Sequence, residues 1–328
     1  MLGHGRSNAG RVRIRRAEKH VRASLKQFHV RHDNNASAAA APSLVRTSLR
    51  NARRRGLAIR WRHARMSAEL LASRPPESES TLVLTLSNPG ARNALHPDMY
   101  AAGVEALATA ERDPAIRAVV LTGADRFFCA GGNLNRLLDN RSKDPSYQAD
   151  SIDQLGAWIT AIRASTKPVI AAVEGAAAGA GFSLALACDL IVAAHDAKFV
   201  MSYARVGLTP DGGGSWFLAR ALPRALAAEI LFEGKPVAAE RLHALGVVNR
   251  LAVPGAASSD ALAWADSLAG ISPNALTRIK SLLDDAPAQP LETHLGTERD
   301  HFVASLHHAD AFEGITAFLE KRQPRYKR

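Results

Sequence analysis

Apolar and polar positions follow two kinds of spacing along the middle of the chain, one typical of strands and one typical of helices. "TLVLTLSNPG" (81–90) follows the period of two that is typical of a strand ended by a turn, whereas "RAVVLTG" (118–124) and "PVIAAVEG" (168–175) are apolar runs typical of buried strands. Between them, residues 95–113 and 151–166 carry apolar side chains at helical spacing. Strands that alternate with helices predict an α/β domain.

The rhythm changes near residue 213, and from there helical spacing continues through Leu319. "DLIVAAHDAKFVMS" (189–202) is the last stretch that we interpret as strands, two short ones around a polar turn. Before the first strand, Pro75 and Pro76 are interpreted as a linker. A helical tail of this length is expected to cover the core or to pack against another subunit.

Composition adds limits to this picture. The 328 residues are 47% hydrophobic and 22% charged, which is typical of a soluble globular protein. No apolar run approaches the ~20 residues that span a bilayer. The two cysteines, Cys129 and Cys188, are too few for a disulfide framework or a zinc site and favour a reducing compartment. We therefore expect a cytoplasmic protein that makes no membrane contact.

The charge is distributed unevenly. Residues 1–65 hold 17 Lys and Arg against two acids, a net charge of +15, whereas the rest of the chain carries −4. This basic head lacks sustained apolar periodicity and is predicted to be disordered. Its composition fits a transit peptide, which would make the protein mitochondrial, and it also fits a nucleic-acid-binding tail. In a third interpretation, Met66 is the true start and the head is translated upstream sequence. All three interpretations stay open.

Two glycine-rich turns carry the candidate chemistry. "FFCAGGNL" (127–134) follows one strand, and "GAAAGAGFSLALACD" (175–189) follows another and opens an apolar helix. Amides at a helix start have no acceptor within the helix and favour an anion. Two such amides that converge on one point form an oxyanion hole. Either turn alone is a common way to end a strand, and no strand–GxGxxG–helix unit for a dinucleotide is present.

Five blocks of sequence, taken in order, resemble the crotonase, or enoyl-CoA hydratase/isomerase, superfamily: "LTLSNPGARNAL", "AVVLTGADRFFCAGGNL", "PVIAAVEGAAAGAGFSLALACDLIVAAHDAKF", "VGLTPDGGGSW" and "EGITAFLEKRQP". The resemblance runs from about Leu82 to Tyr326. It implies an α/β fold with a spiral of β-β-α turns. The implied organisation is a basic extension over 1–65, a spiral core over 66–255 and a helical trimerisation region over 256–328.

The resemblance also implies acyl-CoA thioesters as substrates. CoA is then part of the substrate, and neither a separate cofactor nor a metal is expected. In this family two backbone amides hold the thioester carbonyl, and the matching residues here are Gly132 and Ala180. Their small side chains would let the thioester approach bare N–H groups. A homotrimer or hexamer is the implied assembly.

The same matching gives the positions that are expected to bind CoA. The adenine is expected to meet backbone near Ala91 and Asn93, which share one loop, and Ala130 of the first glycine turn is a further contact. Phe318 and Lys321 match positions on the C-terminal helix that approach the CoA nucleotide.

The sequence departs from the family at the positions that activate water. Hydratases of the family use two glutamates, and the matching residues here are Ser183 and Tyr203. Neither is a carboxylate, and neither is a useful base near neutral pH. Asn133 replaces the aspartate that is usual in the first glycine turn. Hydration by two carboxylates is therefore not expected.

One carboxylate remains nearby in the motif "LTPDGGGSW", namely Asp211. In this respect the chain most resembles the branch that contains 1,2-epoxyphenylacetyl-CoA isomerase and its oxepin-CoA-related neighbours, in which the matching aspartate is the acid/base. The alternative is that Asp211 caps the helix that follows it. Cys129 and Asp189 are interpreted as structural residues, because the sequence places no histidine beside the thiol and buried carboxylates are normally hydrogen-bonded.

From these residues we predict an acyl-CoA isomerase in which Gly132 and Ala180 polarise the thioester and Asp211 moves a proton. The substrate would be an unsaturated or an epoxide/oxepin acyl-CoA in aromatic-acid or fatty-acid breakdown. An enoyl-CoA hydratase or oxepin-CoA hydrolase activity is the first alternative. A non-catalytic relative that binds CoA or RNA is the second, although nucleic acid is not the expected partner.

Overall fold

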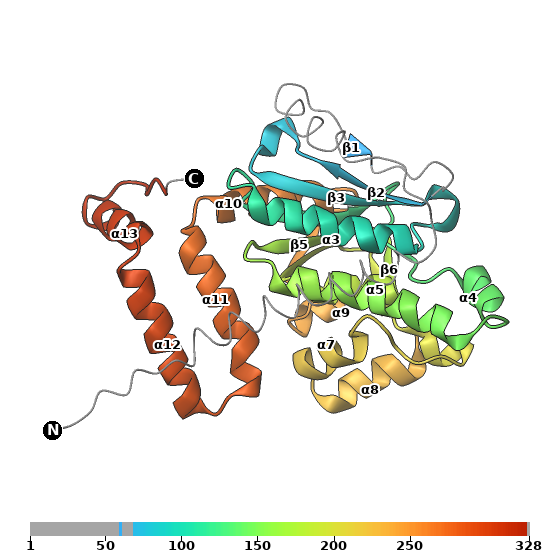
Figure 1. The fold of residues 1–328 in the computed structure, drawn as a ribbon. Coiled ribbons are helices and arrows are strands. Elements are labelled where there is room, and N and C mark those ends of the chain that lie inside the picture. Colours follow the sequence, from blue (N-terminus) through green and yellow to red (C-terminus); the bar gives the residue numbers. More distant parts are fainter. Residues whose placement is uncertain (1–58, 61–67, 327–328) are drawn as a thin grey trace, which may run out of the picture. The chain divides into compact units, whose positions relative to one another are not determined.

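The strands come together in one main sheet (Figure 1). In the computed structural model, which describes residues 59–60 and 68–326, the strands of this sheet stand in the order β1-β2-β3-β4-β5-β7-β10. The predictions for the head, residues 1–65, lie outside the described residues apart from the two-residue strand β1. The α/β prediction is confirmed.

The seven strands of the main sheet are β1 (Ile59–Arg60), β2 (Glu69–Ser73), β3 (Thr81–Ser87), β4 (Ala118–Gly123), β5 (Val169–Val173), β7 (Leu190–Ala194) and β10 (Arg250–Ala252). The first three pair antiparallel, and from β3 to β10 all neighbours are parallel. Every residue of β5 is buried. A continuous apolar run of this kind is what a parallel strand covered on both faces requires.

A second sheet has the order β6-β8-β9 among the described strands. It consists of β6 (Ala176–Ala178), β8 (Lys198–Val200) and β9 (Val237–Ala238). The two strands predicted within 189–202 are present, and the polar turn between them lets the chain leave the main sheet for this second one. The second sheet matters for the site, because β6 leads directly into the second glycine turn.

Helices cover both faces of the main sheet. The helices α3 (Pro97–Arg112) and α5 (Pro145–Ala164) pack together, and α10 (Ala257–Ala269) packs on β4, β5 and β7 from the other side. Trp158 of α5 is fully buried against Gly103 of α3, where a Cβ would lie 2.2 Å from the indole Cε2. A side chain at 103 would therefore force these two helices apart.

The remaining described helices are α4 (Leu134–Asn140), α6 (Ala180–Ala187), α7 (Gly214–Ala221), α8 (Arg224–Glu233), α9 (Ala239–Ala244), α11 (Pro273–Asp285), α12 (Leu291–Leu306) and α13 (Ala309–Leu319). The predicted helical tail is thus confirmed in its main part, but β9 and β10 interrupt it. The interpretation of Pro75 and Pro76 as a linker is wrong, because both residues lie in the connection between the paired strands β2 and β3. None of the described helices has the length and apolar character needed to cross a membrane.

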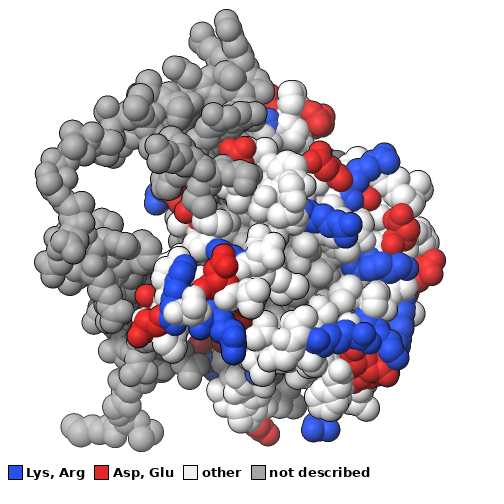
Figure 2. All heavy atoms as spheres, turned by 90° about the vertical axis from the view of Figure 1, so that its right-hand side faces the viewer, with Lys and Arg blue, Asp and Glu red and all other residues white. Residues whose placement is uncertain are grey.

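The charges of the described chain are intermixed on the face that Figure 2 shows. Lys and Arg side chains lie beside Asp and Glu across this face, which is turned by 90° from the view of Figure 1. Their mixing agrees with the near balance of basic and acidic residues after residue 65. The described part of this face therefore presents charges of both signs rather than one basic area.

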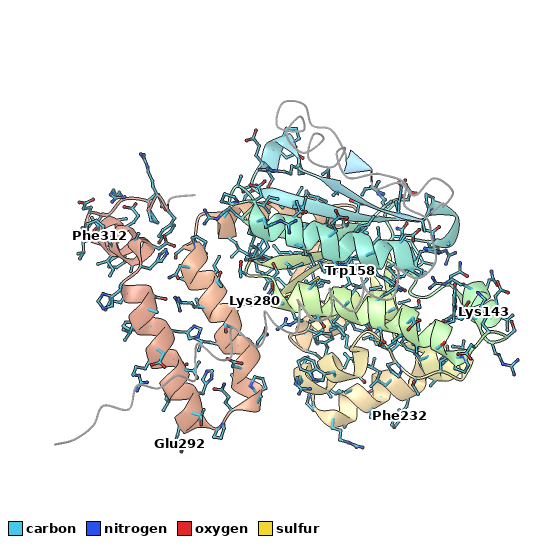
Figure 3. The ribbon with its side chains drawn as sticks, in the orientation of Figure 1. Lys143, Trp158, Phe232, Lys280, Glu292 and Phe312 are labelled. Atoms are coloured by element: carbon cyan, nitrogen blue, oxygen red, sulfur yellow. The ribbon has the colours of Figure 1, made fainter. Side chains whose placement is uncertain are left out.

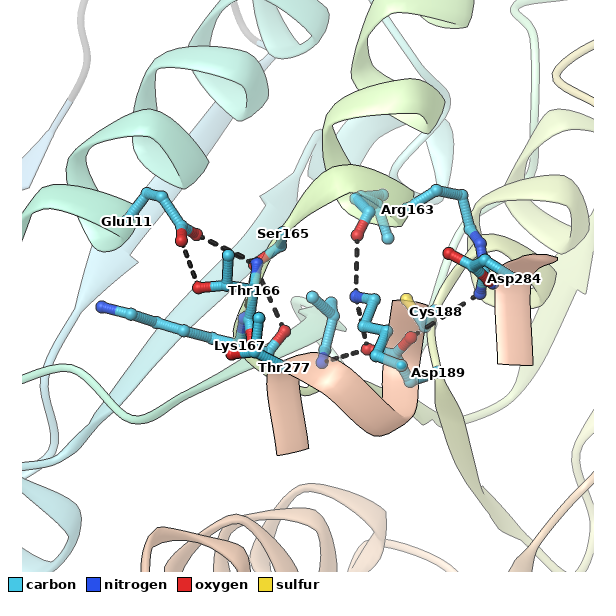
Figure 4. A network of polar contacts seen from close by, with 12 residues as sticks. Glu111, Arg163, Ser165, Thr166, Lys167, Cys188, Asp189, Thr277 and Asp284 are labelled. Atoms are coloured by element: carbon cyan, nitrogen blue, oxygen red, sulfur yellow. Dashed lines mark hydrogen bonds and ion pairs between the residues drawn. The ribbon is translucent and has the colours of Figure 1, made fainter. Parts of the chain in front are cut away.

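The C-terminal helices join the core through α11. Lys280 of α11 donates to Asp189 Oδ2 at 2.8 Å and to the Ile162 carbonyl at 3.2 Å, and Arg163 pairs with both Asp189 and Asp284 (Figure 4). Asp189 Oδ2 also accepts a hydrogen bond from the Val169 amide. The interpretation of Asp189 as a structural residue is confirmed by these contacts.

The C-terminal helices α11, α12 and α13 expose large apolar side chains. Phe312 of α13, labelled in Figure 3, is 77% exposed, and Phe318 is 83% exposed. Further exposed apolar residues of these helices are Ile279, Leu283, Leu291, Leu295, Phe302, Val303, Leu306, Ile315 and Leu319. A concentration of this kind on one helical region marks a surface for interaction.

Candidate active site

The fold places the two glycine-rich turns side by side. The Cys129 amide donates to the Ala176 carbonyl at 3.0 Å, and the Ala178 amide donates to the Cys129 carbonyl at 2.8 Å. These bonds form a parallel bridge between Cys129 and Ala177, which joins the first turn to β6. On its other side, the first turn is held by the Leu95 amide, which donates to the Gly131 carbonyl at 2.7 Å.

Gly131 is required by the close approach of these two segments. Its φ is +83°, and a Cβ at this position would lie 2.5 Å from the Ala178 carbonyl oxygen and 3.3 Å from the Ala180 amide nitrogen. A side chain could not fit there, and the backbone conformation also disfavours one. The same geometry shows that the first turn directly adjoins the start of α6.

Gly132 and Ala180 both present unpaired amides at this junction. Among the residues that the structure describes, neither N–H has a hydrogen-bond acceptor. Ala180 begins α6, so its amide is one of the helix's first N–H groups and lies at the positive end of the helix dipole. Free amides from two adjoining turns can bind an oxygen that carries negative charge.

Asp211 lies in the segment that leads into α7, close to the second turn. Ser183 connects the two: its amide donates to the Gly179 carbonyl at 3.1 Å, and its hydroxyl donates to the Asp211 carbonyl at 2.9 Å. The N-cap of α7 is Gly213, and no side chain caps this helix. The Asp211 carboxylate therefore does not serve as the helix cap that the sequence left open as an alternative.

The Asp211 carboxylate is instead held by Tyr203. The tyrosine hydroxyl donates to Asp211 Oδ1 at 2.6 Å. Burial raises the pKa of Asp211, and the hydrogen bond from Tyr203 acts in the opposite direction. Burial and the nearby Asp211 charge raise the pKa of Tyr203, so its hydroxyl stays protonated and remains a donor. No motif in the sequence indicated this bond.

Tyr100 lies near both Asp211 and Arg136, and no motif in the sequence indicated Tyr100 or Arg136. Tyr100 of α3 is buried, and burial raises its pKa, while the Arg136 charge lowers it and the Asp211 charge raises it. Arg136 of α4 has a buried Nε without a hydrogen-bond partner among the described residues. A tyrosine at a helical apolar position is normally interpreted as a core residue. The sequence pattern therefore could not distinguish Tyr100 from the other core residues of this helix.

The residues predicted to bind the adenine lie in a tightly bonded loop. Ala91 is partly exposed and ends the short turn Pro89–Ala91. The Ala130 amide is already used, because it donates to the Arg92 carbonyl at 3.0 Å. Asn93 is buried, and its side chain donates to the Ala124 and Phe127 carbonyls. Asn93 thus has an internal role, and the contacts of these residues with CoA stay predictions.

Phe318 and Lys321 are not brought together with the glycine turns. Phe318 belongs to α13, which packs on α12, and its exposure leaves it with few contacts to the rest of the described chain. Lys321 follows the end of α13 in the left-handed conformation, with φ +54°. Their contact with the CoA nucleotide stays a prediction.

Cys129 has a structural role in the first turn. Its thiol donates to the Asn93 carbonyl at 3.2 Å, and its sulfur accepts from the Gly131 amide at 3.3 Å. Burial raises the pKa of this thiol to about 12, so it is not a thiolate near neutral pH. Among the described residues, no group of three or more His, Cys, Asp or Glu could hold a metal ion.

Known proteins share this fold and these motifs. Residues 76–328 match the enoyl-CoA hydratase/isomerase family. The chain is 37% identical to 1,2-epoxyphenylacetyl-CoA isomerase of Escherichia coli K12, over 76% of this chain and 95% of the relative. It is 36% identical to 2,3-dehydroadipyl-CoA hydratase of the same strain, over 79% and 99%.

Solved structures of enoyl-CoA hydratases are also similar to this chain. A crystal structure of an enoyl-CoA hydratase from Polaromonas sp. JS666 is 60% identical and superposes with a TM-score of 0.75, over 76% of this chain and 96% of that chain. The chain therefore belongs to the enoyl-CoA hydratase/isomerase family, whose fold is the crotonase fold. The relatives carry the names isomerase, hydratase and dehydratase, so family membership defines CoA-thioester chemistry without choosing among these reactions.

Proposed function

We propose that the protein is an acyl-CoA isomerase. The observation that carries this proposal is the Asp211 carboxylate, held near the start of α6 through Ser183, with Ser183 and Tyr203 at the positions where hydratases of the family have glutamates. One carboxylate can take a proton from carbon and return it to another carbon. Activation of a water molecule by a pair of carboxylates is unavailable to these side chains.

The proposed mechanism divides the work between main chain and side chain. The Gly132 and Ala180 amides donate to the thioester oxygen and stabilise the negative charge that develops as an enolate forms. Asp211 Oδ2 removes a proton α or γ to the carbonyl, and the electron pair moves into the conjugated system. Asp211 then returns the proton at a different carbon, which leaves the acyl-CoA isomerised and the carboxylate regenerated.

Hydration is the second candidate, because the 60% identical structure is named an enoyl-CoA hydratase. Incubation of the full chain with a panel of acyl-CoAs in deuterated water separates the two reactions. Deuterium exchange or double-bond migration without net addition of water supports the isomerase. Clean addition of water supports the hydratase. Binding of CoA thioesters with no turnover of any of them would favour the non-catalytic alternative.

Asp211→Asn tests the assignment of the proton carrier. The expected result is a loss of about 10²–10³ in kcat/KM with thioester binding retained, because the amide cannot accept the proton while the two backbone donors remain. Steady-state kinetics and titration with a saturated acyl-CoA measure the two quantities. Asp196→Asn, at an exposed turn, is the matched control and is expected to keep full activity. Full activity of Asp211→Asn would overturn the assignment.

We also propose that the chain assembles into a homotrimer or hexamer through surfaces that include α11–α13. Support comes from the exposed apolar side chains of these helices, which a monomer would leave in water. The second supporting point is position: α13 carries Phe318 and Lys321 follows its end, and both were predicted to approach CoA although they do not reach the glycine turns of their own chain.

A further inference from the structure

The surroundings of the Asp211 carboxylate are asymmetric. Oδ1 accepts the 2.6 Å hydrogen bond from the Tyr203 hydroxyl, whereas no side chain among the described residues donates to Oδ2. The main-chain oxygen of Asp211 is also fixed, because it accepts from the Ser183 hydroxyl at 2.9 Å and from the Gly214 amide at 3.1 Å. The residue is thus held at its backbone and at one carboxylate oxygen.

We infer that Tyr203 is a positioning residue for Asp211: its hydroxyl fixes Oδ1 and leaves Oδ2 as the one atom that takes up and returns the substrate proton. The inference rests on the proposed isomerase function and adds a residue to it. Tyr203 also lies beside the second glycine turn, since a Cβ on Gly179 would be 3.4 Å from the tyrosine hydroxyl. The hydroxyl therefore orients the carboxylate relative to the start of α6, where the thioester oxygen would bind.

A tyrosine suits this role because it donates without ionising. A second carboxylate at position 203 would repel Asp211 and favour a shared proton between the two. Among the described residues, the Asp211 charge raises the pKa of Tyr203 and of Tyr100, and burial raises the pKa of both, so both are neutral over the working pH range. Arg136 of α4 acts on Tyr100 of α3, whose pKa its charge lowers.

The bond from Tyr203 also sets the protonation state. Burial alone favours the neutral acid form of Asp211, which could not accept a proton from the substrate. The hydrogen bond favours the carboxylate, which accepts it. Loss of the bond should therefore raise the pKa of Asp211 and push the base form to higher pH.

Tyr203→Phe removes the hydroxyl and keeps the ring. We expect kcat/KM at pH 7 to fall about tenfold, the acid limb of the pH profile of kcat/KM to move to higher pH, and KM to stay within about twofold. Tyr326→Phe, near the C-terminus, removes an equivalent hydroxyl away from the site and is expected to leave the profile unchanged. A loss of equal size at every pH, with the acid limb in place, would overturn the inference and leave Tyr203 as a packing residue.

A second variant is expected to move the acid limb of the pH profile in the opposite direction. Site-specific 3-fluorotyrosine at position 203 keeps the shape of the side chain and makes the hydroxyl a stronger donor, so the acid limb should move to lower pH. This variant also preserves a test if Tyr203→Phe does not fold. An unchanged or upward-shifted limb with fluorotyrosine would contradict the inference.

Titration of the Asp211 carboxyl carbon by ¹³C NMR gives a readout that is independent of turnover. The Asp211→Asn spectrum assigns the resonance, and its midpoint is expected to rise in Tyr203→Phe. If Asp211→Asn stays fully active, the proposed function fails, and the NMR midpoint still decides whether Tyr203 holds the carboxylate. If Asp211→Asn is inactive and the midpoint does not move, only the role of Tyr203 fails.

Discussion

At the scale of single residues, the site depends on positions where a side chain cannot be tolerated. Gly131 combines a positive φ with a backbone oxygen 2.5 Å from the place of a Cβ. The free amides of Gly132 and Ala180 lie on either side of this contact. The geometry of the proposed oxyanion hole therefore depends on an absent side chain at 131 rather than on a reactive one.

Gly131→Ala is expected to lower kcat/KM by about 10²–10³, because the added methyl pushes the first turn away from Ala178 and separates the two donors. It should also destabilise the fold by about 1–3 kcal/mol through the strained backbone. Kinetics and urea unfolding measure the two effects.

Gly156→Ala is the control, since nothing lies within 4 Å of a Cβ at this position in α5. We expect unchanged activity and a gain of up to about 1 kcal/mol in stability. Wild-type kinetics in Gly131→Ala would mean that the junction of the two turns does not take part in the reaction.

The sequence indicated candidate residues for the site but not the contacts between their side chains. The motifs indicated Gly132, Ala180 and Asp211, and the blocks around them belong to the family. Tyr203 and Asp211 are eight positions apart in the sequence, and no local pattern indicates that the two side chains meet. Asn93 illustrates the same limit: its sequence position suggested a ligand contact, whereas the fold uses its side chain to tie two loops together.

At the scale of elements, α11 is fastened to the core by a small group of charges. Lys280 is 12% exposed and its partner Asp189 is 18% exposed, so this ion pair is largely shielded from water. Arg163 and Asp284 extend the group to the outer part of α11 (Figure 4). The attachment of α11 to the core therefore depends on ion pairs with Asp189 and Arg163, which lie outside the helix.

Lys280→Met is expected to destabilise the protein by about 3 kcal/mol, because it leaves the Asp189 carboxylate without its closest cation. Urea unfolding followed by circular dichroism measures the change. The control Arg299→Met breaks an ion pair with Asp300 that is exposed on both sides, and it should change the free energy of unfolding by less than about 0.5 kcal/mol. Equal effects of the two variants would contradict this role of Lys280.

Long periodic elements were predictable, whereas the short strands β9 and β10 were not. The stripe of apolar residues along 95–113 indicated α3, and the apolar run at 168–175 indicated β5. The strands β9 and β10 contain two and three residues, too few to show a period of two within a helical stretch. Their conformation comes from pairing with β8 and β7, which is a tertiary effect.

At the scale of the whole molecule, the described chain buries its α/β core but leaves the apolar faces of α11–α13 in water. The family motifs indicated the fold and the helical tail. The resemblance implied a helical trimerisation region over 256–328, but the sequence pattern did not indicate which apolar side chains stay exposed, because an exposed apolar position on a helix has the same spacing as a buried one.

Replacement of Phe312 and Phe318 by aspartate is expected to shift the assembly to smaller species, because the charges would have to be buried in the proposed interface. Size-exclusion chromatography with light scattering gives the mass. The control is Val253→Asp, at an apolar residue of 71% exposure outside these helices, which should keep the wild-type mass. A monomeric wild-type protein, or an unchanged mass in the double variant, would rule out this interface.

The bridge between Cys129 and Ala177 has a consequence for redesign. It joins the two glycine turns through main-chain hydrogen bonds alone. The side chains at 183, 203 and 211 take no part in these bonds. A protein engineer could exchange these three side chains for other polar or titratable ones while the main-chain scaffold of the proposed oxyanion hole stays intact. Variants with the same backbone could in this way catalyse a set of related reactions of acyl-CoA thioesters.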